Sequence, residues 1–199
     1  MPPAERPIPQ FAAEPPQEPL PYGRWEEALA EQFLARAGEA TESDVGTLTW
    51  FPDRTWAGRT YVPVTAPTDD GGEVFGYVSY TREHEGAPAE AYQAVADYTD
   101  ETAAQNPDWS LDLSDQEVGH WRGPRGQRGV VTLVWGVAMV ANGAVATVEL
   151  GPTTTDQCEL LEDRFTLVSL DAYTGDYVEV RLYGSGGAEL ARESLYEDE

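Results

Sequence analysis

Three arginines stand close together in a glycine-rich stretch of the sequence. Arg122, Arg125 and Arg128 lie within residues 119–129, which hold no acidic side chain, and His120 precedes them. Guanidinium groups bind carboxylates and phosphates through paired hydrogen bonds, and glycine lets a ligand approach the backbone closely. The stretch therefore predicts an anion-binding site made by these four side chains, or a docking loop for an acidic partner. The alternative is a turn whose arginines pair with the protein's own carboxylates.

Aromatic residues gather around a second candidate site. Trp50, Trp56 and Tyr61 flank the turn at residues 52–55, which contains Arg54. Flat aromatic rings stack on sugars or peptides and anchor protein interfaces. These four residues are therefore candidates for an interface or a stacking site, and packing in the core and at its rim is the alternative.

Other reactive side chains lack the spacing that catalysis or metal binding requires. His84 and His120 are far apart, and the sequence has no His-x-x-x-His or Cys-x-x-Cys pattern. Cys158 precedes Glu159, whose charge disfavours a thiolate. Calcium binding or glycoside hydrolysis could use clustered acids, but the sequence cannot select a pair. The clusters are Asp69 with Asp70, Asp112 with Asp115 and Glu117, and Asp171 with Asp176. We therefore predict no catalytic residue, no metal ligand and no cofactor.

The charge of the chain excludes several classes of protein. Its 36 acidic residues outnumber 12 basic ones, which gives a net charge of −24, and every basic residue is arginine. Without lysine there is no Schiff-base enzyme, no Walker A loop and no kinase-type strand lysine. The negative field repels nucleic acid and anionic membranes. A GC-rich genome or a salt-rich cytoplasm would explain the same bias without a binding role.

Cysteine usage and the N-terminal pattern bear on the location of the protein. The single cysteine, Cys158, excludes an internal disulfide. No apolar stretch follows a charged N-terminal region in the manner of a signal peptide. Both observations lead us to expect a cytoplasmic protein.

The first 22 residues differ in composition from the rest of the chain. Eight of the 15 prolines fall in residues 1–22, and proline fixes φ and removes a backbone donor. This composition predicts an extended or disordered arm, or an arm that lies across a neighbouring subunit with Phe11, Leu20 and Tyr22 as anchors. Residues 23–199 are then expected to form a single globular domain.

Two segments show helical periodicity, and strands dominate the remainder. Residues 24–37 carry apolar side chains at i, i+3 and i+4 spacing, and residues 88–105 carry a similar stripe. The uncharged residues 129–148 are rich in Val and contain Asn142-Gly143. That pattern predicts a hairpin of two paired, buried strands and not a membrane helix. The order of the elements predicts an α+β fold, mostly antiparallel β in a sheet or sandwich, with about two helices.

These features leave three functional hypotheses. The preferred one, because no catalytic group stands out, is a non-enzymatic interaction or structural protein. It would assemble with itself or with another protein through its β-rich body and its proline-rich arm. The second is a small anionic-ligand binding module that uses Arg122, Arg125 and Arg128. The third is a carboxylate-based hydrolase, which needs two facing acids in a concave site.

Overall fold

The computed structural model describes residues 14–16, 19–122, 126, 128–150, 153–171 and 178–195. Within these residues the chain forms one helix, α1 (Gly23–Ala40), and twelve strands. The strands are β1 (Thr49–Trp50), β2 (Arg54–Trp56), β3 (Arg59–Pro67), β4 (Glu73–Thr81), β5 (Glu90–Thr99), β6 (Leu111–Arg122), β7 (Arg128–Ala138), β8 (Gly143–Leu150), β9 (Thr153–Glu159), β10 (Arg164–Asp171), β11 (Val178–Gly184) and β12 (Glu189–Ser194). The predicted α+β fold with mostly antiparallel β structure is confirmed, with one helix in place of about two.

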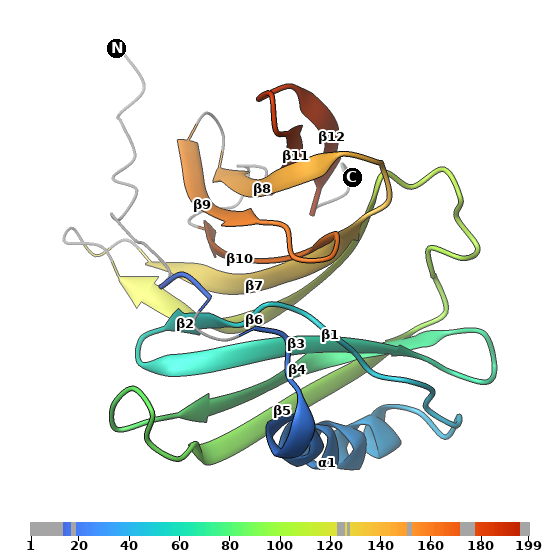
Figure 1. The fold of residues 1–199 in the computed structure, drawn as a ribbon, viewed down its shortest axis with the longest axis vertical. Coiled ribbons are helices and arrows are strands. Elements are labelled where there is room, and N and C mark those ends of the chain that lie inside the picture. Colours follow the sequence, from blue (N-terminus) through green and yellow to red (C-terminus); the bar gives the residue numbers. More distant parts are fainter. Residues whose placement is uncertain are drawn as a thin grey trace.

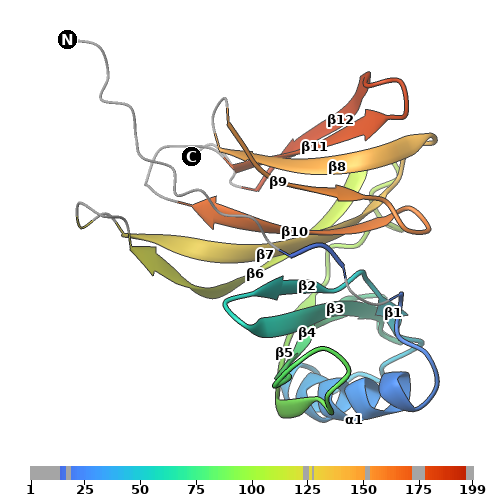
Figure 2. The same cartoon turned by 60° about the vertical axis from the view of Figure 1, so that its left-hand side comes forward.

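The strands form three antiparallel sheets that follow one another outward from the helix (Figures 1 and 2). The helix-side sheet has the order β1-β3-β4-β5, and β2 also pairs with β3. The middle sheet has the order β10-β7-β6, and the outer sheet has the order β12-β11-β8-β9. Each boundary between layers buries the alternate side chains of the strands that meet there.

Helix α1 covers one face of the helix-side sheet (Figure 1). Its buried residues Leu29, Phe33 and Ala37 recur every four positions, so they share one face of the helix. They pack against a cluster that includes Val62 and Val78 of the sheet. The helix predicted at residues 24–37 is therefore confirmed.

The helix predicted at residues 88–105 is wrong, because its central part is strand β5. Tyr92, Ala94 and Ala96 pack against the cluster beneath α1, while Val95 packs against the cluster on the other side of the sheet. This alternation has the period of two that strands have. The expected helical stripe relied on alanines, which fit either period, and hydrogen bonding to β4 along the strand decided the outcome.

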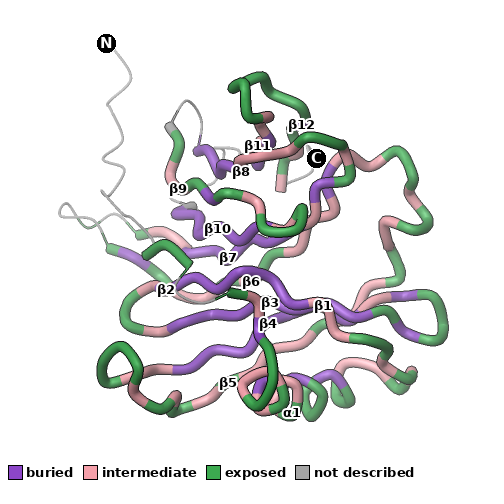
Figure 3. Tube along the Cα trace, viewed as in Figure 1, coloured by how far each residue is buried: buried purple, intermediate pink, exposed green. Residues whose placement is uncertain are grey.

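The larger core cluster draws residues from all three sheets and surrounds the middle sheet. Residues 131–136 of β7 are buried one after another (Figure 3). Burial of both faces explains why residues 129–148 carry no charge. The predicted pairing of this segment into a hairpin is wrong: β7 pairs with β6 and β10, whereas β8 pairs with β9 and β11. The turn itself is present, with Asn142 at φ 69°, but it carries the chain from the middle sheet to the outer one.

Candidate functional site

A buried ion pair joins two strands that are distant in the sequence. Arg54 on β2 and Asp156 on β9 are 102 residues apart, and Arg54 Nη2 lies 2.5 Å from Asp156 Oδ1. Their side chains are only 3% and 7% exposed. Breaking such a pair is costly, because either partner alone would be an unpaired buried charge.

Asp156 is also bound by backbone donors. Its Oδ2 accepts a hydrogen bond from the Val168 N–H on β10 (2.9 Å), and its Oδ1 accepts one from the Gln157 N–H (2.9 Å). Burial raises the pKa of the Asp156 carboxyl, while Arg54 and the backbone donors oppose the rise. Because β2, β9 and β10 belong to three different sheets, the pair ties all three layers together.

The same guanidinium holds a piece of the N-terminal arm. Arg54 Nη1 donates to the carbonyl oxygen of Glu14 (3.0 Å), and the Glu14 N–H donates to the carbonyl oxygen of Thr55 (3.2 Å). Glu14 therefore forms an antiparallel bridge with Thr55 at the edge of β2 opposite β3 (Figure 2). The described part of the arm adds one further pairing to the helix-side sheet.

Two cavities border this arm segment. The first has a volume of about 400 Å³, and the second has a volume of about 530 Å³. Pro15 and Pro16 line both. The first is also lined by Arg54, Val145, Gln157, Cys158 and Glu159, and the second by Glu14, Thr55, Gly58, Thr60, Arg82, His84 and Glu85. We call β2 and these two cavities the arm groove.

The single thiol of the chain lies in the arm groove. Cys158 is buried, and its Sγ is 3.0 Å from the carbonyl oxygen of Glu159. Burial raises the pKa of the Cys158 thiol, while a backbone hydrogen bond at Thr166 and the charge of Arg54 oppose the rise. A thiol in this state is a poor nucleophile.

The aromatic residues predicted to form a stacking site occupy different places. Trp50 and Tyr61 are buried in separate clusters on opposite faces of the helix-side sheet. Trp56 is partly buried and packs against the larger cluster. Arg54 on β2 and Tyr61 on β3 are cross-strand partners, so the structure places these two candidates next to each other. Trp50 instead packs in the cluster beneath α1.

Two of the three clustered arginines lie opposite one another. Arg122 and Arg128 are cross-strand partners at the end of the β6–β7 hairpin, and both are exposed. Within the described residues neither forms an ion pair with a carboxylate, whereas His120 is exposed with its Nε2 3.3 Å from Glu117 Oε1. Arg125 lies outside the described residues. Like charges directly opposite on two strands repel one another, so this hairpin end is a local concentration of positive charge.

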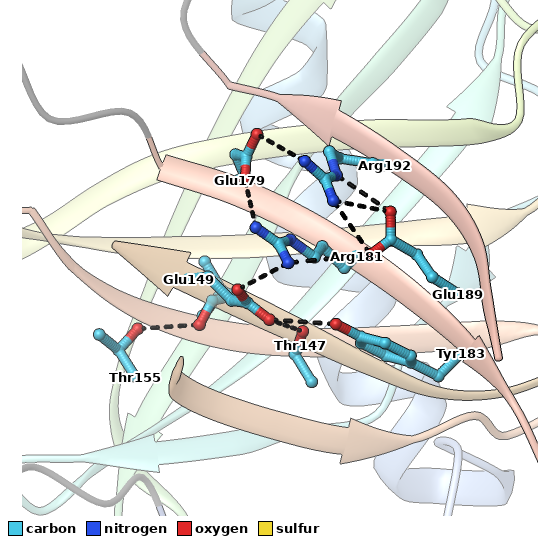
Figure 4. Close-up of polar contacts among 9 residues, drawn as sticks. Thr147, Glu149, Thr155, Glu179, Arg181, Tyr183, Glu189 and Arg192 are labelled. Carbon is cyan, nitrogen blue, oxygen red and sulfur yellow. Dashed lines mark hydrogen bonds and ion pairs between the residues drawn. The ribbon is translucent and has the colours of Figure 1, made fainter. Parts of the chain in front are cut away.

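Other arginines are neutralised within the outer sheet (Figure 4). Arg181 on β11 lies 3.3 Å from the buried carboxylate of Glu149, and Arg192 on β12 lies 3.0 Å from Glu189. The remaining side chains of this network are Thr147, Glu179 and Tyr183. The network faces away from the core, because Val178, Val180 and Leu182 alternate with its members and are buried in the larger cluster.

A smaller cavity between the helix-side and middle sheets collects carboxylates. It has a volume of about 240 Å³, and its lining includes Glu73 on β4, Asp112 and Asp115 on β6, and Trp109. Burial raises the pKa of Glu73 to about 7, and the charge of Asp112 adds to the rise. Carboxyl groups held at different pKa values are suited to general acid–base chemistry. The sequence grouped Asp112 with Asp115 and missed Glu73, because the packing of the helix-side sheet on the middle sheet brings Glu73 from another part of the chain.

In the acidic turn at Asp69 and Asp70, neighbouring hydroxyl groups donate hydrogen bonds to the Asp70 carboxylate. Asp70 accepts hydrogen bonds from the hydroxyls of Thr68 (2.5 Å), Ser43 (2.7 Å) and Tyr98 (2.9 Å). These bonds, that of Thr68 first, hold the pKa of Asp70 well below its usual range. Among the described residues, no group of three or more His, Cys, Asp or Glu side chains could hold a metal ion. The side chain of Asp171 and all of Asp176 lie outside the described residues.

No protein-family model, curated protein or solved structure matches this chain. In the part of the chain that the structure describes, no helix is both long enough and apolar enough to cross a membrane.

Proposed function

We propose that this chain is a non-enzymatic interaction protein whose β body docks an extended, proline-containing polypeptide segment in the arm groove. The observation that carries the proposal is the pair of contacts to Glu14, whose carbonyl oxygen accepts from Arg54 and whose N–H donates to Thr55. Both contacts reach the backbone, so they recognise an extended chain at a sheet edge, as strand addition does.

Proline suits the positions that follow Glu14 in the groove. Pro15 and Pro16 border both cavities. Neither has an N–H to continue a strand ladder, so pairing stops after the single bridge. A proline segment is already extended before it binds, which lowers the conformational entropy lost on docking.

Arg54 is held in place before any segment docks. Its Nη2 binds Asp156 and also donates to the Gln157 carbonyl oxygen (3.1 Å). These bonds fix the guanidinium, so little rotamer freedom is lost when Nη1 receives a carbonyl group. A charged donor also forms a stronger hydrogen bond than a neutral one.

Binding of the arm as a separate peptide tests the proposal. A chain that begins at Pro19 keeps both hydrophobic clusters, because none of their described members precedes Trp25. A fluorescent peptide of residues 1–18 is expected to bind this shortened chain saturably in an anisotropy titration. The full-length chain is expected to bind the peptide more weakly, because its own arm competes for the groove.

Two peptide variants separate groove binding from general adhesion. Glu14→Pro removes the N–H that donates to Thr55 and is expected to lose most of the affinity. Glu14→Gln keeps that donor and the length of the side chain, and it is expected to bind more tightly than the Glu14→Pro peptide. Equal binding of the Glu14→Pro peptide, or no saturable binding at all, would contradict the proposal.

A second candidate function, binding of a small anion, is supported by the end of the β6–β7 hairpin. Arg122 and Arg128 face each other there and are exposed. An anion between two guanidinium groups would relieve their mutual repulsion and receive charge-assisted hydrogen bonds from both.

A further inference from the structure

We propose that the arm is exchanged between two copies of this chain, so that residues 14–16 of each copy lie in the arm groove of the other. The inference rests on the proposed function, because it names the partner whose segment fills the same groove. It makes each groove incomplete without a residue from the second copy.

The contacts that hold Glu14 are the same whichever copy supplies it. They consist of the hydrogen bonds to Arg54 (3.0 Å) and Thr55 (3.2 Å) and of the two prolines that follow. Exchange of an identical segment keeps every such contact. The balance between the closed and exchanged forms is therefore decided by the linker and by the protein concentration.

The linker between the arm segment and α1 resists a compact turn. It includes Pro19 and Pro21, which fix φ and lack the N–H that a hydrogen-bonded turn uses. Tyr22 is extended, with φ −149° and ψ 157°. In the closed form the arm lies on its own body, where Glu14 contacts Arg54 and Thr55, and the two prolines limit how compactly the chain can return there.

The chain changes direction at Gly23, the first residue of α1. Gly23 has φ 58°, a value that glycine adopts as readily as its negative counterpart. The preceding residue, Tyr22, makes no side-chain capping bond to the first turn of α1. Rotation about Gly23 therefore moves the arm at the expense of one backbone hydrogen bond, from the Glu26 N–H to the Tyr22 carbonyl oxygen (3.3 Å).

Release of the arm disturbs little of the core. Glu14, Pro15 and Pro16 are exposed even when they lie in the groove. No described member of either hydrophobic cluster precedes Trp25. Pro21 is buried and leaves its place when the arm is released, but neither hydrophobic cluster has to unfold for exchange.

The charge of the chain sets the conditions for exchange. Two copies of net charge −24 repel one another, whereas the arm itself carries only −2, from Glu5, Glu14 and Glu18 against Arg6. Salt screens the repulsion over about 8–10 Å at physiological strength. Exchange is therefore expected to increase with added salt.

An engineered disulfide across the groove reports which copy supplies the arm. Pro16 and Cys158 line the same cavity, so the variant Pro16→Cys in the full-length chain is expected to form a disulfide with Cys158 under mild oxidation by oxidised glutathione. Pro15→Cys serves as a second position, because Pro15 lines the same cavity. Ala35→Cys, on the exposed side of α1, measures disulfides formed by random collision.

The expected product is a covalent dimer on a non-reducing gel, several-fold above the Ala35→Cys background and increasing with salt. When isotopically heavy and light protein are mixed before oxidation, the disulfide-linked peptides should join one heavy and one light partner. A disulfide formed only within single chains would overturn the exchange and leave the proposed function standing. No disulfide to Cys158 above the Ala35→Cys background, from either position 15 or position 16, would overturn both.

Discussion

The indole ring of Trp56 on β2 lies so close to Gly119 on β6 that a Cβ atom at position 119 would come within 2.6 Å of it. This contact joins the helix-side sheet to the middle sheet directly beside His120. The side chain that the sequence assigned to a stacking site therefore also positions the strand that carries the clustered arginines.

Gly119→Ala is expected to destabilise the fold by about 1–3 kcal/mol, the usual cost of forcing a methyl group into a packed contact. Urea unfolding followed by tryptophan fluorescence measures the change. Gly38→Ala in α1 is the control, because nothing lies within 4 Å of its added Cβ. That change is expected to stabilise the protein by about 0.5–1 kcal/mol. Equal stability of the two variants would mean that the Trp56 contact gives way freely.

Arg54→Met and Asp156→Leu are each expected to cost about 3–5 kcal/mol, because each leaves a buried charge without its partner. The double variant should cost less than the sum, since neither charge then remains, with a coupling of about 0.5–3 kcal/mol. Chemical unfolding of all four chains measures this cycle. Arg36→Met, whose partner Glu39 is exposed, should leave the unfolding midpoint unchanged. Additive losses for Arg54 and Asp156 would refute the coupling.

Arg181→Met is expected to lower stability by about 1–3 kcal/mol, because the buried Glu149 carboxylate then loses its cation. Arg192→Met is the matched change on the neighbouring strand. The Arg192 side chain is 47% exposed, so the thermal midpoint of the Arg192→Met variant should stay within error of that of the natural protein. Calorimetry of both variants checks the difference. A larger loss of stability for Arg192→Met would show that the exposed pairs of Arg192 with Glu179 and Glu189 matter more than the buried Glu149.

Glu73 predicts a dependence of stability on pH. Its pKa in the fold is about 7 against an ordinary value of 4.5, so between these values the folded state holds a proton that the unfolded state releases. Stability from this group is full below about pH 4.5, falls as pH rises toward 7 and stays low above it. Glu73→Gln removes this loss.

The measurement is urea unfolding of natural protein and Glu73→Gln from pH 5 to pH 8. The free energy of unfolding of the variant should rise relative to that of the natural protein as pH rises, so its urea midpoint should be the higher of the two at pH 8. Glu101→Gln, an exposed change on the same cavity, should show no such trend. A constant difference between Glu73→Gln and natural protein would refute the burial argument.

Citrate or phosphate is expected to raise the thermal midpoint if the β6–β7 hairpin binds anions. At ten times the dissociation constant the gain is about 1.4 kcal/mol. Replacing both Arg122 and Arg128 with Gln should abolish the gain at constant ionic strength. Replacing the exposed Arg24 and Arg36 of α1 with Gln keeps the same net charge change and should leave the gain intact. An anion-dependent shift that survives the first double change would place the site elsewhere.

Local sequence patterns were sufficient for some of these features. Apolar spacing predicted α1, because one helix face is decided by residues within a few turns of one another. The turn at Asn142 and the burial of residues 131–136 and 146–148 also followed, since turn chemistry and lack of charge are local properties. Arg54 was named as a candidate interface residue from its aromatic neighbours alone, and that role stays a prediction.

Tertiary structure decided the rest. Residues 90–99 became a strand because β4 offered a pairing edge, which no periodicity within that segment reveals. Asp156 was one of 36 acids, and only the packing of three sheets brought it to Arg54. Glu73 reached Asp112 in the same way. The sequence determines which side chains are apolar, charged or rigid, but burial and pairing depend on contacts between segments far apart in the chain, and these set both the arm groove and the pKa of Glu73.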